Sequence, residues 1–175
     1  MMPTFRFVSY REFATACYQL AAQIQTTVPQ PKIEYLISIQ RGGAMMSKIL
    51  ADALDLPIAT VVVSSYQDLH RHKQPFISQE LAVDVRGKSV LLLDEICDSG
   101  DTLALTRQYV LQKGAARAET AVLFLKPAAR FQPTYWVNKS SEWVVFPGEV
   151  FETARIFTKL PTGDAAVQEQ FRQFL

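Results

Sequence analysis

The sequence predicts an α/β fold: one parallel-sheet domain with helices on both faces. Short apolar runs typical of buried strands recur along the chain, and segments with helical periodicity separate them. Strands and helices that alternate in this way form a parallel sheet, because the helix after each strand carries the chain back to the end of the sheet where the next strand begins. The predicted buried strands are residues 35–39, 58–63, 90–93 and 121–125.

Length and composition restrict the class of protein. The 175 residues suit a single domain with a substantial core. The 18 basic and 17 acidic side chains leave a formal charge of +1, which disfavours a nucleic-acid surface. No apolar run approaches the roughly 20 residues of a membrane span, and the first residues show no apolar leader. Cys17 and Cys97 match no metal or redox spacing. We therefore expect a cytoplasmic protein that binds neither membranes nor nucleic acid.

The N-terminal half contains two predicted helices. Ser9 and Glu12 form a capping box that opens the first helix, which ends before Pro29 and Pro31. A second helix is expected over residues 43–54, after the strand at 35–39. The polar stretch 67–82 shows no clear period and predicts a long mobile loop. The inward stripes are expected to be Phe13, Cys17, Leu20 and Ile24 in the first helix, and Met46, Ile49, Leu50 and Ala53 in the second.

The C-terminal half continues the alternation and then becomes less regular. A helical pattern covers residues 103–113 and closes at Gly114. Aromatic strands are expected at 135–137 and 143–146. A final amphipathic helix is expected to begin near Asp164 and to bury Val167, Phe171 and Phe174.

The most informative stretch is residues 90–102, with the sequence VLLLDEICDSGDT. Asp94 and Glu95 follow the apolar run, at the strand end where α/β sheets bind their ligands. Small and hydroxyl residues come next, and the start of the following helix favours an anion, usually phosphate. Carboxylates for hydroxyls or a metal thus stand beside a phosphate cradle, which indicates a sugar-phosphate site. The alternative interpretation is an ordinary strand followed by an acidic turn.

Two other strand ends carry residues suited to the same ligand. Arg41, Gly42 and Gly43 follow the strand at 35–39, where the glycines let the backbone approach a ligand closely and adopt positive φ, and the arginine can bind an anion. Lys126 follows the strand at 121–125, where its ammonium can donate to a carbonyl oxygen. Trp143 offers a ring for base stacking, although a core aromatic is the simpler interpretation of that residue alone.

Residues 90–102 resemble the signature of the type I phosphoribosyltransferases, with Ser99 in place of the usual threonine. The segment from Lys126 to Arg130, followed by Trp143 to Pro147, is similar to the bacterial and archaeal xanthine–guanine phosphoribosyltransferases. The likeness implies one domain, with a core over about 9–126, a base-binding segment over about 126–152 and an extension over about 153–175. It also implies phosphoribosyl pyrophosphate and a purine base as substrates, Mg²⁺ as cofactor and assembly as a homodimer or homotetramer.

The same resemblance assigns roles to residues. The loop at Arg41 would hold pyrophosphate, and relatives often have a cis peptide there. Asp94 and Glu95 would hold the ribose hydroxyls and Mg²⁺, and Asp98 would act as the general acid/base on the purine. The resemblance implies contacts of the 5′-phosphate with Cys97, Ser99, Gly100, Asp101 and Thr102. It implies contacts of the base with Lys126, Trp143, Val144 and Glu149. A mobile hood over the site would include Ser65, Tyr66 and Arg71.

Asp101 places an extra carboxylate beside the expected phosphate, and this carboxylate would repel the phosphate unless the side chain turns away. Gly148 stands where the xanthine–guanine enzymes often have tryptophan, so the preferred base stays open. Adenine is disfavoured because Lys126 suits an oxo group. Three alternatives remain: a transferase for another base, a sensor of nucleotides or phosphoribosyl pyrophosphate on the same fold, and a structural domain.

Overall fold

The computed structural model describes residues 4–27, 32–65, 74–158, 169 and 171. They form two compact units, one comprising Ala14–Ser141 and the other Met1–Phe13 with Glu142–Leu175. None of the helices within the described ranges is long and apolar enough to cross a membrane.

The larger unit is built on a six-stranded sheet in the order β4-β3-β2-β5-β6-β7. All neighbouring strands are parallel except β3 and β4, which form an antiparallel pair at one edge. The α/β prediction is confirmed. The strands are β2 (Tyr35–Gln40), β3 (Ile58–Ser65), β4 (Pro75–Gln79), β5 (Ser89–Cys97), β6 (Arg117–Leu125) and β7 (Tyr135–Lys139).

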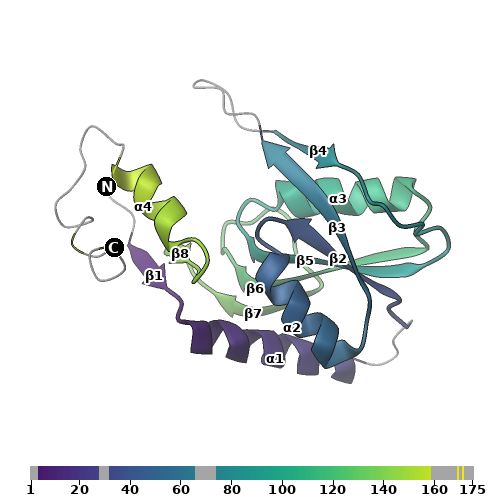
Figure 1. Cartoon of the computed structure of the whole chain (residues 1–175), viewed down its shortest axis with the longest axis horizontal. Coiled ribbons are helices and arrows are strands. Elements are labelled where there is room, and N and C mark those ends of the chain that lie inside the picture. The colour runs from purple at the N-terminus through teal and green to yellow at the C-terminus, as the bar shows by residue number, and fades with distance from the viewer. Residues whose placement is uncertain (1–3, 28–31, 66–73, 159–168, 170, 172–175) are drawn as a thin grey trace. The chain divides into compact units, whose positions relative to one another are not determined.

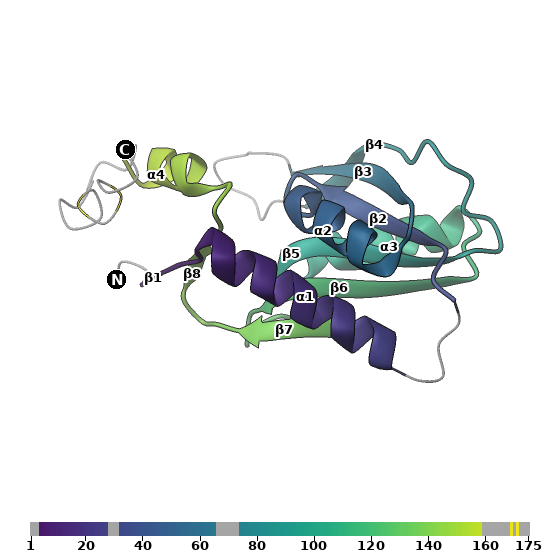
Figure 2. The same cartoon turned by 60° about the horizontal axis from the view of Figure 1, so that its bottom comes forward.

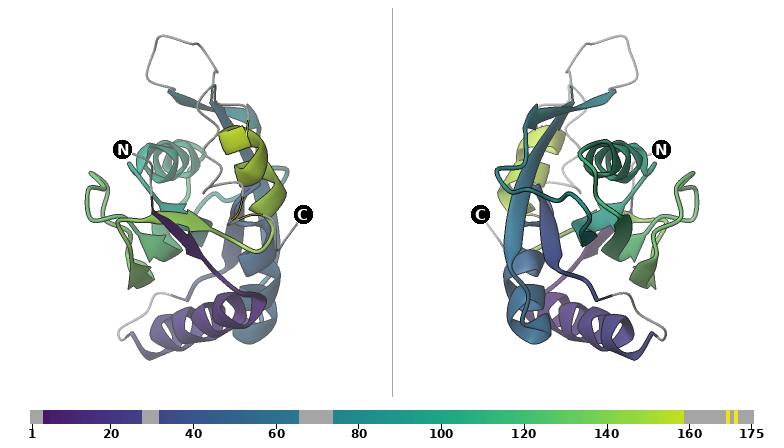
Figure 3. Two further views of the ribbon diagram at one scale, coloured as in Figure 1. Left: turned by 90° about the vertical axis from the view of Figure 1, so that its left-hand side faces the viewer. Right: turned by 90° about the vertical axis from the view of Figure 1, so that its right-hand side faces the viewer.

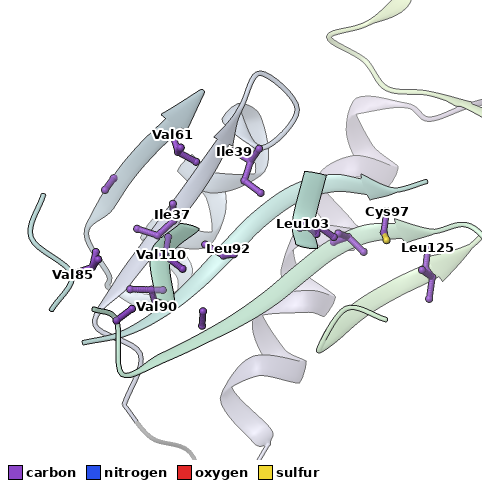
Figure 4. Close-up of a cluster of buried hydrophobic side chains, with 14 residues drawn as sticks. Ile37, Ile39, Val61, Val85, Val90, Leu92, Cys97, Leu103, Val110 and Leu125 are labelled. Atoms are coloured by element: carbon purple, nitrogen blue, oxygen red, sulfur yellow. The ribbon is translucent and has the colours of Figure 1, made fainter. Parts of the chain in front are cut away.

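Helices cover both faces of this sheet (Figures 1 and 3). α1 (Tyr10–Thr26), from Ala14 onward, and α2 (Ala44–Leu54) lie on one face, and α3 (Asp101–Gln112) lies on the other. Figure 2 shows α1 and α2 together on their side of the sheet. On the α3 face, Leu103 and Val110 pack against alternate strand residues such as Ile37 and Leu92 (Figure 4).

The predicted helix stripes are confirmed in α1 and partly wrong in α2. All four predicted residues of α1 are at most 2% exposed. In α2, Met46 and Leu50 are buried and Ile49 is half-buried, but Ala53 is exposed and Ser47 is buried instead. Ser47 tolerates burial because its hydroxyl donates to the carbonyl of Gly43 at 2.5 Å.

Residues 75–79 correct the prediction of a loop over 67–82, because they form β4. β4 begins at Pro75, an acceptable residue at the first position of an edge strand, where a missing N–H leaves no partner unsatisfied. Its Ile77 packs against the α3-side core. Such a short strand has no period of its own, and its pairing with β3 stabilises it.

The smaller unit contains the aromatic strand expected at 143–146, which is β8 (Trp143–Val145). It also contains two elements that the sequence did not predict: β1 (Phe5–Phe7), which pairs in parallel with β8, and α4 (Val150–Thr158). Val145 and Phe157 form its core with Phe171, which is buried as predicted. Asp164, Val167 and Phe174, also assigned to the final helix, lie outside the described residues.

Gly43 occupies the most crowded position where β2 turns into α2. A Cβ on Gly43 would lie 2.3 Å from the carbonyl oxygen of Leu93 and 2.9 Å from that of Ile39. Only glycine therefore allows the backbone after β2 to pass this close to β5.

Gly43→Ala should lower the free energy of unfolding by about 3 kcal/mol or more, because backbone rather than a flexible side chain must move. Gly87→Ala is the control: Gly87 has φ +70° with open space around it, so its cost should be about 1 kcal/mol. Urea unfolding of both variants measures the difference. Equal losses would show that crowding at Gly43 does not matter.

Candidate active site

The candidate site lies where the β2–α2 turn meets β5. β2 pairs with β5 only as far as Ser38 opposite Leu93, so Asp94 and Glu95 lie just beyond the paired part of the two strands, although β2 itself continues to Gln40 along β3. β5 itself continues to Cys97 along β6, which corrects the prediction that the strand ends at Leu93. The two acids therefore stand on a rigid strand, beside the turn that follows β2.

Gly42 brings this turn against the carboxylates. A Cβ on Gly42 would lie 2.4 Å from Oδ1 of Asp94 and 3.2 Å from Oε1 of Glu95. Glu95 is 6% exposed, and Asp94 Oδ1 accepts the backbone N–H of Glu95 at 2.9 Å. The predicted anion turn and the predicted acid pair thus form one constellation.

The turn itself has an unusual backbone. The peptide bond between Gln40 and Arg41 is cis, as the resemblance implied for this loop. Gly43 has φ −67°, and neither Gly42 nor Gly43 adopts positive φ. The sequence-based expectation of positive φ is therefore wrong, and close packing explains both glycines. Arg41 is exposed at the start of the turn.

The signature loop, residues 98–102, leads from β5 into α3. Asp98 and Ser99 are exposed, and Gly100 is the N-cap of α3 with φ +91°. α3 begins at Asp101, two residues before the predicted start, and Thr102 lies half-buried in its first turn. The loop therefore has the position of an anion cradle at a helix N-terminus.

A second loop, which we call the lysine loop (residues 126–131), is hydrogen-bonded to the signature loop and to the end of β5. The N–H of Lys126 donates to the carbonyl of Cys97 at 2.9 Å, and the N–H of Arg130 donates to that of Ser99 at 3.0 Å. A Cβ on Gly100 would lie 2.3 Å from Cβ of Phe131. The motif from Lys126 to Arg130 is visible in the sequence, but this contact between loops is not.

Asp101 does not stand alone beside the cradle. Its carboxylate forms an ion pair with Arg130, whose Nη2 lies 3.0 Å from each carboxylate oxygen. It also accepts the hydroxyl of Ser99 at 2.9 Å. A pocket of about 750 Å³ opens beside these side chains, lined also by residues of α3 and by Gln74 and Pro75.

The predicted base-binding residues divide between the two units. Lys126 belongs to the larger unit and follows β6. In the smaller unit, Trp143 is 41% exposed and meets the ring of Phe157 edge-on, with centroids 5.1 Å apart. Val144 is buried opposite Arg6 in the β1–β8 pair, and the N–H of Glu149 donates to the carbonyl of Phe146 at 2.9 Å.

The hood residues are largely undescribed. Ser65 ends β3, opposite Pro75 of β4. Tyr66 and Arg71 lie outside the described residues, so their assignments stay predictions.

Cys97 is buried between the two loops, and its thiol lies 3.5 Å from the carbonyl oxygen of Phe131. Burial raises its pKa to about 11, and the carboxylates of Asp94 and Asp98 add to the shift. The thiol therefore stays protonated at neutral pH, which excludes a nucleophilic role there.

In the native protein, alkylation of Cys97 by iodoacetamide should stay slow up to about pH 9 and accelerate only toward pH 11, because burial suppresses the thiolate. In urea the rate should rise near the ordinary thiol pKa of about 8.5. Peptide mass spectrometry measures both profiles. Cys17, whose pKa burial raises to about 12, should react still later in the native protein. Native alkylation of Cys97 at the unfolded rate at pH 8 would contradict the assignment.

Known proteins resemble this chain in sequence and in fold. A family model described as phosphoribosyl transferase domain matches residues 8–152. The xanthine-guanine phosphoribosyltransferase of Nitratidesulfovibrio vulgaris is 29% identical over 115 residues, which are 64% of this chain and 66% of the relative. That of Cereibacter sphaeroides is 27% identical over 120 residues, with coverages of 66% and 68%. The match thus spans about two thirds of these relatives.

Solved structures give the same result. The purine phosphoribosyltransferase of Pyrococcus horikoshii superposes with a TM-score of 0.73 at 26% identity, covering 82% of this chain and 92% of the other. The Helicobacter pylori xanthine-guanine-hypoxanthine phosphoribosyltransferase shares the fold, with a TM-score of 0.74 at 24% identity and coverages of 87% and 98%. The family model, the relatives and the fold agree: this chain belongs to the type I phosphoribosyltransferase family.

Proposed function

We propose that this protein transfers the phosphoribosyl group of phosphoribosyl pyrophosphate to N9 of a 6-oxopurine, with Mg²⁺ as cofactor. The acceptor would be guanine, xanthine or hypoxanthine, and the products a purine mononucleotide and pyrophosphate. The observation that carries the proposal is the contact of the Arg41–Gly43 turn with the carboxylates of Asp94 and Glu95. It joins an anion site to a hydroxyl or metal site beside the α3 cradle.

The donor set suits Mg²⁺. Asp94 and Glu95 offer only oxygen ligands, which Mg²⁺ prefers, and the ion usually retains waters and binds substrate phosphates. Within the described ranges, no group of three or more His, Cys, Asp or Glu side chains could hold a metal by itself. Substrate and water would therefore complete the coordination. Bound Mg²⁺ would neutralise charge on the pyrophosphate.

The side chains would divide the reaction between them. Arg41 would stabilise the departing pyrophosphate as the bond from C1′ to its oxygen breaks, and the bond from N9 to C1′ forms. Asp98 would accept the proton that the purine loses, as a general base. The signature loop would hold the 5′-phosphate, and orientation of the two substrates would supply much of the rate enhancement.

The base would be selected by its carbonyl group. Lys126 follows β6 in the larger unit, and its ammonium can donate to the 6-oxo group but not to a 6-amino group. The names of the curated relatives support a 6-oxopurine acceptor.

A direct assay supplies phosphoribosyl pyrophosphate and Mg²⁺ with guanine, xanthine, hypoxanthine, adenine and orotate in parallel, and measures mononucleotide by chromatography. Turnover is expected with one or more of the first three. Chelation with EDTA should abolish it, and excess Mg²⁺ should restore it. Turnover with adenine alone would contradict the role of Lys126. Binding of phosphoribosyl pyrophosphate without any turnover would indicate a sensor.

Asp98→Asn should lower kcat by about 10²–10⁴-fold, because the amide cannot accept the purine proton. The Kd for phosphoribosyl pyrophosphate, measured by calorimetry, should change little, since the sugar and phosphate contacts remain. Asp52→Asn on α2, another carboxylate on the surface, is the matched control and should keep wild-type turnover. Wild-type kcat in the Asp98 variant would remove Asp98 from the proposed role.

A further inference from the structure

We infer that Arg130 is a positioning residue, which keeps the signature loop competent for phosphate by holding and neutralising Asp101. The inference rests on the proposed function, because it assigns the loop a phosphate ligand. It adds a second residue of the lysine loop, after Lys126, to the proposed site.

The contacts form a closed ring around Ser99. Nη2 of Arg130 donates to both carboxylate oxygens of Asp101, and its backbone N–H donates to the carbonyl of Ser99. The hydroxyl of Ser99 donates to Oδ2 of Asp101, whose own N–H lies 3.3 Å from Oγ of Ser99. Every polar group of Ser99 in this ring is thus oriented, directly or through Asp101, by Arg130.

The charge of the Asp101 carboxylate decides how this ring of contacts affects phosphate binding. Asp101 is the first residue of α3, where the helix start favours an anion. An uncompensated carboxylate there would repel a phosphate and compete with it for backbone N–H groups. The guanidinium of Arg130 compensates this charge and holds the carboxylate beside the lysine loop, where the carboxylate also accepts the hydroxyl of Ser99.

The ion pair of Arg130 with Asp101 is exposed, so its effect on ligand binding can be measured without unfolding the protein. The side chains of Arg130 and Asp101 are 76% and 48% exposed. Ion pairs this exposed contribute little to stability, so removing the pair should leave the fold intact. An effect on phosphate affinity would then report the charge at the loop.

The test compares wild type, Arg130→Gln and the double variant Arg130→Gln/Asp101→Asn. In Arg130→Gln, the Kd for ribose 5-phosphate and the KM for phosphoribosyl pyrophosphate should both rise about three- to tenfold, while kcat at saturation changes less than about twofold. The double variant should recover most of the lost affinity, because the unpaired carboxylate is gone. A merely structural role of Arg130 would give no such recovery.

The matched control is the exposed ion pair of Arg86 with Asp84 in the loop between β4 and β5. Arg86→Gln should leave both constants at wild-type values. Circular dichroism melting checks that all variants stay folded.

The readouts distinguish the two proposals. Wild-type binding of ribose 5-phosphate without turnover would end the proposed function and leave this inference standing. Turnover with unchanged constants in Arg130→Gln, or a double variant as weak as Arg130→Gln, would overturn the inference alone. A wild-type protein that neither binds ribose 5-phosphate nor turns over phosphoribosyl pyrophosphate would overturn both.

Discussion

The site depends on the parallel pairing of β2 with β5 and on its early end. Because the pairing stops at Ser38 and Leu93, the acids of β5 extend into the space where β2 turns toward α2. Gly43 lets that turn pass against the backbone of Leu93, and Gly42 lets it reach the carboxylates. A side chain at either glycine would push the turn away from Asp94 and Glu95, so backbone packing sets the distance between the anion turn and the acid pair.

The second constraint is the attachment of the lysine loop to the signature loop. Two backbone hydrogen bonds and the packing of Gly100 on Phe131 link residues that are some thirty positions apart in the sequence. The same attachment buries Cys97 and places Arg130 over Asp101. A loop that would otherwise carry an uncompensated acid at the start of α3 is thereby both fixed and neutralised.

The acid pair and the signature loop are supported by different kinds of backbone structure. The acid pair lies on β5, which continues here along β6, whereas Ser99 and Asp98 lie on an exposed loop. Orienting groups on a strand suits the ribose hydroxyls and a metal, whose geometry is demanding. A loop anchored by a few bonds suits a phosphate, which backbone N–H groups can bind from several directions.

The sequence by itself determined the parallel sheet, the buried faces of β2, β5 and β6, the stripe of α1 and the signature stretch. In each case the periodicity or the motif is local. Only the tertiary structure decided that β4 is a strand, that β1 pairs with β8, that Ser47 rather than Ala53 is buried in α2, and that Arg130 pairs with Asp101. For α4 the sequence does carry a local signal, because Val150, Ala154 and Phe157 have helical spacing, although no helix was expected there. The other features depend on contacts between distant segments, which no local pattern encodes.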